Sequence, residues 1–357
     1  MKHALHVELT PTNACNQKCS YCFESGCHRD GITNEEADRQ LSILSNTVKA
    51  VNEGDYDGMC LTFWGGEPFL NVEFMLCAIK ILESCKDYRI SIYTNGTYRK
   101  GMDMFLDGVN HATMKRTSLQ FSYDGEPHHT VKRGYSPDVM IEYVKKFLDA
   151  GADAHFKATL SLDMIDSLPD IWKSYESLFM KLGNVVSYSP TLDTVDRISE
   201  EDVQMWISAM KKIARLEFDF ARKHGRPLMS WFGPGYRGNC RLTNTVNVQP
   251  DGNIYICHAC PYMSDCRKTL LGNTSEIETF DDVTIKTYPD TMSEDCVNCG
   301  ATYCTICHAS LLRPDEDPAK EWLNVKSREP LRCKLFREFG KIHLAFILAC
   351  CRNRAAK

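Results

Sequence analysis

The sequence lacks any long hydrophobic segment and any large excess of one charge. Its longest unbroken apolar run, Leu344 to Cys351, is far shorter than the roughly 20 residues that a membrane-spanning helix needs, and MKHALHVELT at the start contains no signal-peptide core. With 42 basic and 47 acidic residues, the chain has no strong positive field to attract nucleic acid. Internal repeats, coiled-coil heptads and low-complexity tracts are absent as well. We therefore expect a soluble, cytoplasmic protein with no membrane partner.

Cysteine, by contrast, is abundant. The 357 residues include 18 cysteines, and in a chain without a secretion signal this density indicates metal or redox chemistry rather than a disulfide framework. Three lie within residues 15–22 and nine within residues 240–333. The other six are Cys27, Cys60, Cys77, Cys85, Cys350 and Cys351, and we interpret them as small buried hydrophobic residues.

Alternating hydrophobic patterns predict an α/β fold. Strand-like stretches rich in β-branched and aromatic residues cover residues 3–10, 60–66, 89–96, 117–125, 154–162 and 184–192. Stretches with helical length and period lie between them, for example at 32–51, 72–85 and 137–150. Six such alternations indicate parallel βαβ units that curl into a partial (β/α)6 TIM-like barrel. In barrels of this kind the chemistry lies at the carboxyl ends of the strands.

The chain is expected to divide near residue 225. A long helix that begins at Ser199 and reaches about Lys223 is followed by Gly225 and Pro227, which end helices. We therefore predict a barrel domain at 1–225 and a small cysteine-rich domain at 226–357, ordered mainly by metals. The last helix, near 333–351, has an apolar stripe that we expect to pack on the barrel.

The motif CNQKCSYCF places cysteines at positions 15, 19 and 22. Structural zinc requires four protein ligands, and Cys27 and His28 are the local candidates for the fourth. A four-iron cluster bound by three thiolates instead leaves one iron open to a substrate or cofactor. That open position would then be the active site.

These residues resemble the signature of the radical S-adenosylmethionine (SAM) enzymes. Trp64-Gly65-Gly66-Glu67-Pro68 is similar to the family's GGEP motif, and the Asn95 and Asp124-Gly125 segments are similar to its motifs after the third and fourth strands. The resemblance implies that Cys15, Cys19 and Cys22 bind a [4Fe-4S] cluster, that SAM is cleaved to a 5′-deoxyadenosyl radical, and that Glu67 receives the methionyl ammonium. The implied SAM-binding residues are Tyr21, Phe23, Gly65, Gly66, Glu67, Pro68, Asn95, Ser122 and Asp124, with Arg133 or its neighbour Lys132 for the methionyl carboxylate.

The cysteine-rich C-terminal third resembles the SPASM extension of one branch of this family. That resemblance rests on Cys240, PDGNIYIC (250–257) and the CxxC pairs at 296–307. It implies one or two auxiliary [4Fe-4S] clusters, the first bound by Cys240, Cys257 and Cys307, with Cys260 or Cys266 as a further ligand. The second would be bound by Cys296, Cys299, Cys304 and Cys333. Structural zinc is the alternative for these cysteines.

His258 directly follows Cys257, where some family members carry an acid that serves as the base. Histidine can transfer protons near neutral pH, so we predict that His258 is catalytic; the alternative is a hydrogen bond to a cluster sulfur or the loop backbone.

The resemblance implies an oxidoreductase that oxidises, crosslinks or epimerises a peptide or protein residue, with flavodoxin or ferredoxin as electron donor. The first strand starts at about His3, which leaves no room for a leader-binding domain, so a separate recognition protein would be needed. Two alternatives remain. One is radical modification of a nucleotide, nucleic-acid base or small metabolite, and the other is a non-enzymatic iron–sulfur or zinc protein. The GGEP, Asn95 and Asp124 motifs favour the enzyme, because an electron carrier needs no pocket for SAM.

Overall fold

The computed structural model describes residues 3–22, 24, 31–183, 188–192, 198–233, 244–262, 269–284, 299 and 330–355. The chain forms two compact units that interleave along the sequence. Unit 1 comprises Met1–Ser122, Lys132–Ala154 and Arg241–Tyr288, and unit 2 comprises Tyr123–Val131, His155–Cys240 and Pro289–Lys357. The expected division at residue 225 stays a prediction.

Unit 1 is built on a sheet in which the strands lie in the order β4-β3-β2-β1-β7-β8-β9. The strands are β1 (Ala4–Leu9), β2 (Gly58–Phe63), β3 (Tyr88–Thr94), β4 (Thr117–Ser122), β7 (Thr245–Val248), β8 (Asn253–Tyr255) and β9 (Leu270–Asn273). β1 pairs in parallel with both β2 and β7, so that Leu9 lies opposite Phe63 on one side and Val248 on the other. The loops that follow β1, β2 and β3 therefore leave the same edge of the sheet.

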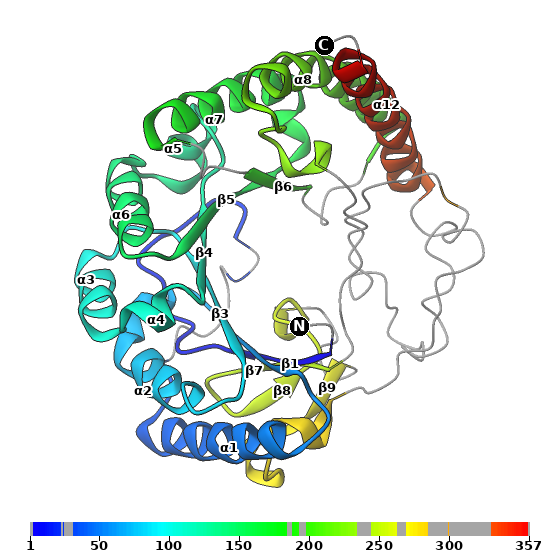
Figure 1. The fold of residues 1–357 in the computed structure, drawn as a ribbon. Coiled ribbons are helices and arrows are strands. Elements are labelled where there is room, and N and C mark those ends of the chain that lie inside the picture. The colour runs from blue at the N-terminus through cyan, green and yellow to red at the C-terminus, as the bar shows by residue number, and fades with distance from the viewer. Residues whose placement is uncertain are drawn as a thin grey trace. The chain divides into compact units, whose positions relative to one another are not determined.

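Helices α1, α2, α3 and α6 lie along one side of these strands (Figure 1). The helices of unit 1 are α1 (Asn34–Glu53), α2 (Val72–Leu82), α3 (Arg99–Gly108), α4 (His111–Met114) and α6 (Asp138–Asp149), with the short 3-10 helix η1 (Pro68–Asn71). α1 begins after Thr33, whose hydroxyl accepts a hydrogen bond from the Glu36 backbone at 3.2 Å, and its buried face includes Ile43, Leu44 and Val48. The helices thus cover one face of the sheet with their apolar stripes.

Unit 2 contains a parallel strand pair and three long helices. Its elements are β5 (Asp153–Leu160), β6 (Tyr188–Leu192), η2 (Leu162–Ser167), α7 (Leu168–Leu182), α8 (Glu200–His224), η3 (Ser230–Phe232) and α12 (Pro330–Ala355), and helix α5 (His128–Arg133) runs from this unit into unit 1. α8 begins with a capping box between Ser199 and Asp202 and ends at Gly225, where φ is +78°. On α12, Leu335, Phe336 and Phe339 are wholly buried.

The α/β fold class and all six predicted strands are confirmed, and so is the helix from Ser199 to Gly225. The interpretation of the six scattered cysteines as buried is confirmed for Cys85 and wrong for Cys77 and Cys351, which are exposed. Cys60 and Cys350 are half-buried, and Cys27 lies outside the described residues. None of the helices in the part of the chain that the structure describes is long and apolar enough to cross a membrane.

A buried carboxylate holds the end of α8 in unit 2. Glu217 has no exposed surface, and its oxygens accept hydrogen bonds from Trp172 Nε1 at 2.6 Å and from the backbone N–H groups of Leu228 and Met229 at 2.8 Å each. Burial raises the pKa of Glu217 to about 7, although these three donors act in the opposite direction. The charged form of Glu217 therefore costs stability in the folded state.

Substitution Glu217→Gln is expected to flatten the pH dependence of stability. Because the folded-state pKa lies above the ordinary value of 4.5, the stability linked to the neutral carboxyl is present below pH 4.5 and is lost as the pH rises through 7. Between pH 5 and pH 8 the free energy of unfolding of the wild type should fall by about 2.5 kcal/mol more than that of the variant. Urea unfolding at both pH values measures this. The control Asp219→Asn, at an exposed position on the same helix, should show the same pH dependence as the wild type. If the free energy of unfolding of Glu217→Gln fell as much between the two pH values as that of the wild type, the prediction would be contradicted.

Candidate active site

The loop that follows β1 carries the three-cysteine motif in unit 1. Cys15, Cys19 and Cys22 are all half-buried, and none of the three forms a disulfide with another described residue. The Cys22 backbone N–H donates to the Cys19 carbonyl at 3.2 Å, and the Ser20 N–H donates to the Lys132 carbonyl at 2.9 Å, which ties the loop to the end of α5. Burial raises the pKa of Cys15 to about 11; a hydrogen bond from the Gln17 backbone opposes this shift. These thiols are accessible enough to bind a metal cluster and become ligands once deprotonated.

Three cysteine thiols on one loop are the donor set that a four-iron cluster takes. In such a cluster each cysteine binds a different iron, so the sulfurs need not converge on one point as the four ligands of structural zinc do. The chemistry of the three thiols therefore fits the cluster that the motif implies.

Two glycines let the loop after β2 lie directly against the cysteine loop. The N–H of Gly66 donates to the Thr12 carbonyl at 3.1 Å, and the N–H of Glu67 donates to the Ala14 carbonyl at 2.9 Å. Gly65 has φ of +125°, and a Cβ added there would lie 2.4 Å from the Thr12 oxygen. A Cβ on Gly66 would lie only 2.2 Å from the Ala14 oxygen. Side chains are thus excluded at both positions by backbone contact.

The Glu67 side chain connects this loop to the end of β3. It is wholly buried, and its carboxylate accepts hydrogen bonds from the Thr94 hydroxyl and the Asn95 N–H, each at 2.8 Å, and from the Phe69 N–H at 3.3 Å. Burial raises the pKa of Glu67 to about 7, and the three donors limit that rise. Three protein donors thus use part of the accepting capacity of the carboxylate that we expected to receive the methionyl ammonium, and that role stays a prediction.

Asn95 lies beside the first cysteine. Its Nδ2 is 2.8 Å from Asn16 Oδ1 and 3.8 Å from Cys15 Sγ, while its Oδ1 accepts from the Thr97 N–H at 2.9 Å. The Tyr135 hydroxyl donates to the Asn95 carbonyl at 3.0 Å. The loop after β3 is therefore held in contact with the loop after β1, as the order of motifs predicted.

Arg133 and Tyr21 meet next to the second cysteine. Arg133 is only 9% exposed, its guanidinium lies 5.3 Å from the centre of the Tyr21 ring, and its Nη1 is 4.0 Å from Cys19 Sγ. A buried cation at this position can bind a carboxylate. The alternative candidate, Lys132, contributes its carbonyl to the cysteine loop.

Pro68, Ser122 and Asp124 occupy the ends of strands or the start of a helix. Pro68 is buried as the first residue of η1, and Ser122 is half-buried as the last residue of β4 in unit 1. Asp124 belongs to unit 2, where it is wholly buried and accepts a hydrogen bond from the Thr159 N–H at 3.1 Å.

His258 lies in a cluster that the sequence did not reveal. Its Nδ1 is 3.1 Å from Glu8 Oε2, and its ring stacks on Trp64 with centroids 3.9 Å apart. Trp64 Nε1 donates to Glu24 Oε1 at 3.0 Å, and Tyr93 contacts the Trp64 ring edge-on. Burial alone lowers the pKa of His258, but the nearby Cys257, Glu8 and Glu24 together raise it to about 9. Glu8, an acidic residue inside strand β1, was the available signal for this cluster.

The auxiliary ligands are described only in part. Cys257 and Cys260 lie within hydrogen-bonding reach of each other, an arrangement that, with burial, raises the pKa of Cys257 well above its ordinary value. Of the two candidates for a further ligand of the first cluster, the structure thus places Cys260 beside Cys257, with its side chain wholly buried. Cys299 and Cys333 are half-buried. The predicted residues that lie outside the described residues are Phe23, Cys240, Cys266, Cys296, Cys304 and Cys307.

Comparison with curated proteins finds relatives that act on nucleotides. The chain is 26% identical over 212 residues to an S-adenosylmethionine-dependent nucleotide dehydratase of Fibrobacter sp. (strain UWH6), and 26% identical over 152 residues to a GTP 3′,8-cyclase of Cronobacter sakazakii (strain ATCC BAA-894). These matches cover 58% and 43% of this chain, and 54% and 44% of the relatives. The chain therefore spans about half the length of the curated relatives it matches.

Comparison with solved structures finds similar folds over most of the chain. His6-tagged anSMEcpe with bound AdoMet aligns with a TM-score of 0.66 and 16% identity, covering 98% of this chain and 96% of that one. Streptococcus suis SuiB bound to S-adenosylmethionine aligns with a TM-score of 0.59 and 15% identity, covering 90% and 78%. At these identities the likeness shows a shared fold.

A family model matches the part of the chain that contains the candidate site. The radical SAM superfamily model matches residues 9–178, which include the three cysteines, the GGEP segment and Asn95. That family implies a [4Fe-4S] cluster with SAM, and the matched residues include the loops after β1, β2 and β3. Residues 9–178 of this chain therefore carry a radical SAM domain.

Proposed function

We propose that this enzyme uses SAM to take a hydrogen atom from a peptide or protein residue, which is then oxidised, crosslinked or epimerised. Cys15, Cys19 and Cys22 would hold the catalytic cluster, which supplies the electron that cleaves SAM to methionine and a 5′-deoxyadenosyl radical. Glu67 would fix the loops that surround SAM, and Arg133 would bind the methionyl carboxylate.

The residues around His258 favour a peptide substrate over a nucleotide. Glu8, Glu24, Trp64 and Tyr93 make this part of the site acidic and aromatic. Acidic side chains repel the phosphates of a nucleotide, whereas a peptide presents backbone amides and apolar groups that such a surface can bind. The proposal is also supported by the fold shared with anSMEcpe and SuiB, which have been solved with a peptide and with the precursor peptide SuiA, respectively.

A nucleotide substrate is the second candidate. The two curated relatives act on nucleotides according to their names, and they match this chain at higher sequence identity than the solved structures do. A small metabolite belongs to the same alternative, because an enzyme that acts on a metabolite, like one that acts on a nucleotide, requires no separate protein to recognise a peptide.

The SPASM-like third would add oxidising capacity. Cys257 and Cys260, which lie side by side, would be ligands of one auxiliary [4Fe-4S] cluster, and Cys299 and Cys333 are predicted ligands of a second. Such clusters, when bound, can accept the electron that a substrate radical loses. His258, next to Cys257, would accept the proton that leaves the substrate in the same oxidation, so that hydrogen-atom loss, electron loss and proton loss add up to a closed-shell product. Because its pKa is raised to about 9, His258 is neutral and able to accept that proton mainly above pH 9.

Anaerobic reconstitution followed by isotope transfer tests this function. The reconstituted protein should bind about twelve irons, and with SAM and dithionite it should form 5′-deoxyadenosine. Incubation with a deuterated peptide pool should yield 5′-deoxyadenosine that carries deuterium, whereas deuterated nucleoside triphosphates should not. Deuterium transfer from the nucleotides alone would overturn the peptide assignment. About four irons together with zinc would overturn the auxiliary clusters but leave the radical enzyme.

His258→Ala supplies a second arm of this experiment. Deuterium transfer should persist because His258 acts after hydrogen abstraction, while formation of the oxidised product should fall by about a hundredfold, as is typical for loss of a general base. His111→Ala, at an exposed position on α4, is the matched control. Equal product formation by His258→Ala and the wild type would show that His258 has only a structural role.

A further inference from the structure

Unit 2 contains an apolar groove between two helix ends that the catalytic chemistry does not use. Its volume is about 380 Å³, and its walls come from the last turns of α8 and the last turns of α12. Phe232 of η3 also lines the groove, with its ring centre 5.0 Å from that of Phe346. The groove is thus a concave apolar surface between two packed helices.

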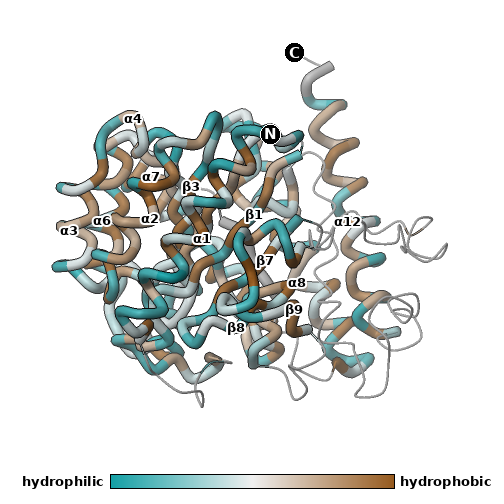
Figure 2. Tube along the Cα trace, turned by 90° about the horizontal axis from the view of Figure 1, so that it is seen from below, coloured by the Kyte–Doolittle hydropathy of each residue, from teal (hydrophilic) through white to brown (hydrophobic). Residues whose placement is uncertain are grey.

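One exposed stripe on α12 continues from this groove. Leu344 is 57% exposed, Ile347 36% and Leu348 50%, and Cys351 is exposed as well. Of the six large hydrophobic side chains that are exposed among the described residues, three therefore lie within two turns of this helix. The spacing i, i+3, i+4, i+7 places all four residues on one face, and Figure 2 shows hydrophobic residues along α12. A stripe of this kind is the surface onto which another helix packs.

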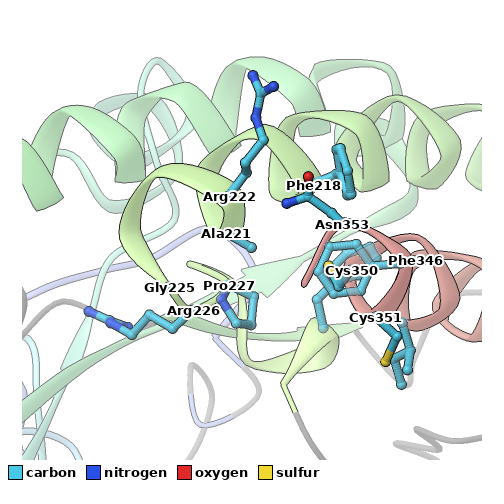
Figure 3. Close-up of a pocket in the computed structure, with 12 residues that line it drawn as sticks. Phe218, Ala221, Arg222, Gly225, Arg226, Pro227, Phe346, Cys350, Cys351 and Asn353 are labelled. Carbon is cyan, nitrogen blue, oxygen red and sulfur yellow. The ribbon is translucent and has the colours of Figure 1, made fainter. Parts of the chain in front are cut away.

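The edge of the groove is basic. Arg222 and Arg226 line it from the α8 side, and Figure 3 shows both side chains directed away from the aromatic and cysteine side chains. Lys223 is exposed beside them, and Arg352 is exposed next to the stripe on α12. Arg222 pairs with Asp219 at 3.5 Å, but this ion pair is exposed and therefore weak. A ligand with acidic residues would gain charge complementarity along this edge.

We propose that the groove and the stripe Leu344–Cys351 bind an acidic amphipathic helix of a partner protein. The occupant needs apolar residues at helical spacing for the stripe and carboxylates for the arginines. A second copy of this chain fits poorly, because a symmetric contact would bring the basic edges together. A concave groove also accommodates the ridge of a helix better than the plane of a membrane. This proposal uses surface residues of unit 2 alone and does not depend on the proposed substrate.

Binding of designed peptides to the full-length reconstituted protein tests the proposal. One labelled peptide of about four helical turns carries Leu at i, i+3, i+4 and i+7 with Glu elsewhere, and its match carries Lys in place of Glu. Fluorescence anisotropy should show at least about tenfold tighter binding of the acidic peptide, weakening as salt is added. Equal binding of the two peptides would overturn the proposal.

Surface variants show whether binding occurs at this place. Ile347→Asp with Leu348→Asp, and separately Arg222→Glu, should each weaken binding of the acidic peptide about tenfold. These positions are exposed, so folding should be retained, and Met180→Asp on α7, where the side chain is 63% exposed, should leave binding unchanged. Two results would overturn the proposal in favour of another occupant. One is a dimer by light scattering that the α12 double variant abolishes, and the other is sedimentation with phosphatidylserine vesicles that the same variant abolishes.

Discussion

Replacing Cys15, Cys19 and Cys22 together with alanine is expected to abolish 5′-deoxyadenosine formation. Alanine offers no ligand to iron, and the three thiols are the cysteines that the loop after β1 presents beside Asn95 and Arg133. With dithionite and SAM under anaerobic conditions, the product should fall at least about a hundredfold, to the level without protein. Liquid chromatography with mass detection measures it directly.

Iron content separates loss of the cluster from loss of the fold. The triple variant should retain about eight of about twelve irons if two auxiliary clusters are present, because their proposed ligands lie elsewhere in the sequence. The control Cys77→Ala removes an exposed thiol on α2 and should change neither iron content nor 5′-deoxyadenosine formation. Undiminished 5′-deoxyadenosine formation by the triple variant would mean that the catalytic cluster is bound by other cysteines.

Local patterns were sufficient to predict the meeting of the cysteine, GGEP and Asn95 loops. Hydrophobic periodicity located β1, β2 and β3. Because neighbouring strands are parallel, the loops that follow them begin at the same end of the sheet. Motifs that follow successive strands in the sequence therefore lie close together in the structure. What the sequence could not predict was the direction of the Glu67 carboxylate, because burial and three neighbouring donors determine it.

The His258 cluster was beyond prediction for a different reason. Glu8 and His258 are 250 positions apart in the chain and meet because β7 pairs with β1 and β8 pairs with β7. β7 is only four residues long, and so short a strand carries no signal that identifies its neighbour in the sheet. The sequence predicted His258 from its place after Cys257, but its partners Glu8, Trp64 and Glu24 required the tertiary structure.

At Gly66 the backbone of the GGEP loop lies directly against the backbone of the cysteine loop. A Cβ there would lie 2.2 Å from the Ala14 carbonyl oxygen and 2.7 Å from that of Asn13, well inside any allowed contact. Because both neighbours are backbone atoms, no side-chain rotation can relieve the clash. The cysteine loop or the GGEP loop would have to move by about an ångström, and the hydrogen bond from Glu67 to Ala14 would be lost.

Gly66→Ala is therefore expected to lower 5′-deoxyadenosine formation by about a hundredfold, since a displacement of about 1 Å at a reacting group has effects of that size. All the cysteines remain in this variant, so the iron content should stay close to that of the wild type. Gly31→Ala is the matched control, because its Cβ would make ordinary contact with Thr12 Oγ1 at 3.7 Å. If Gly66→Ala kept full activity, the GGEP loop would not position SAM. If it lost iron together with activity, the contact with Ala14 would instead be holding the cysteine loop in a cluster-binding conformation.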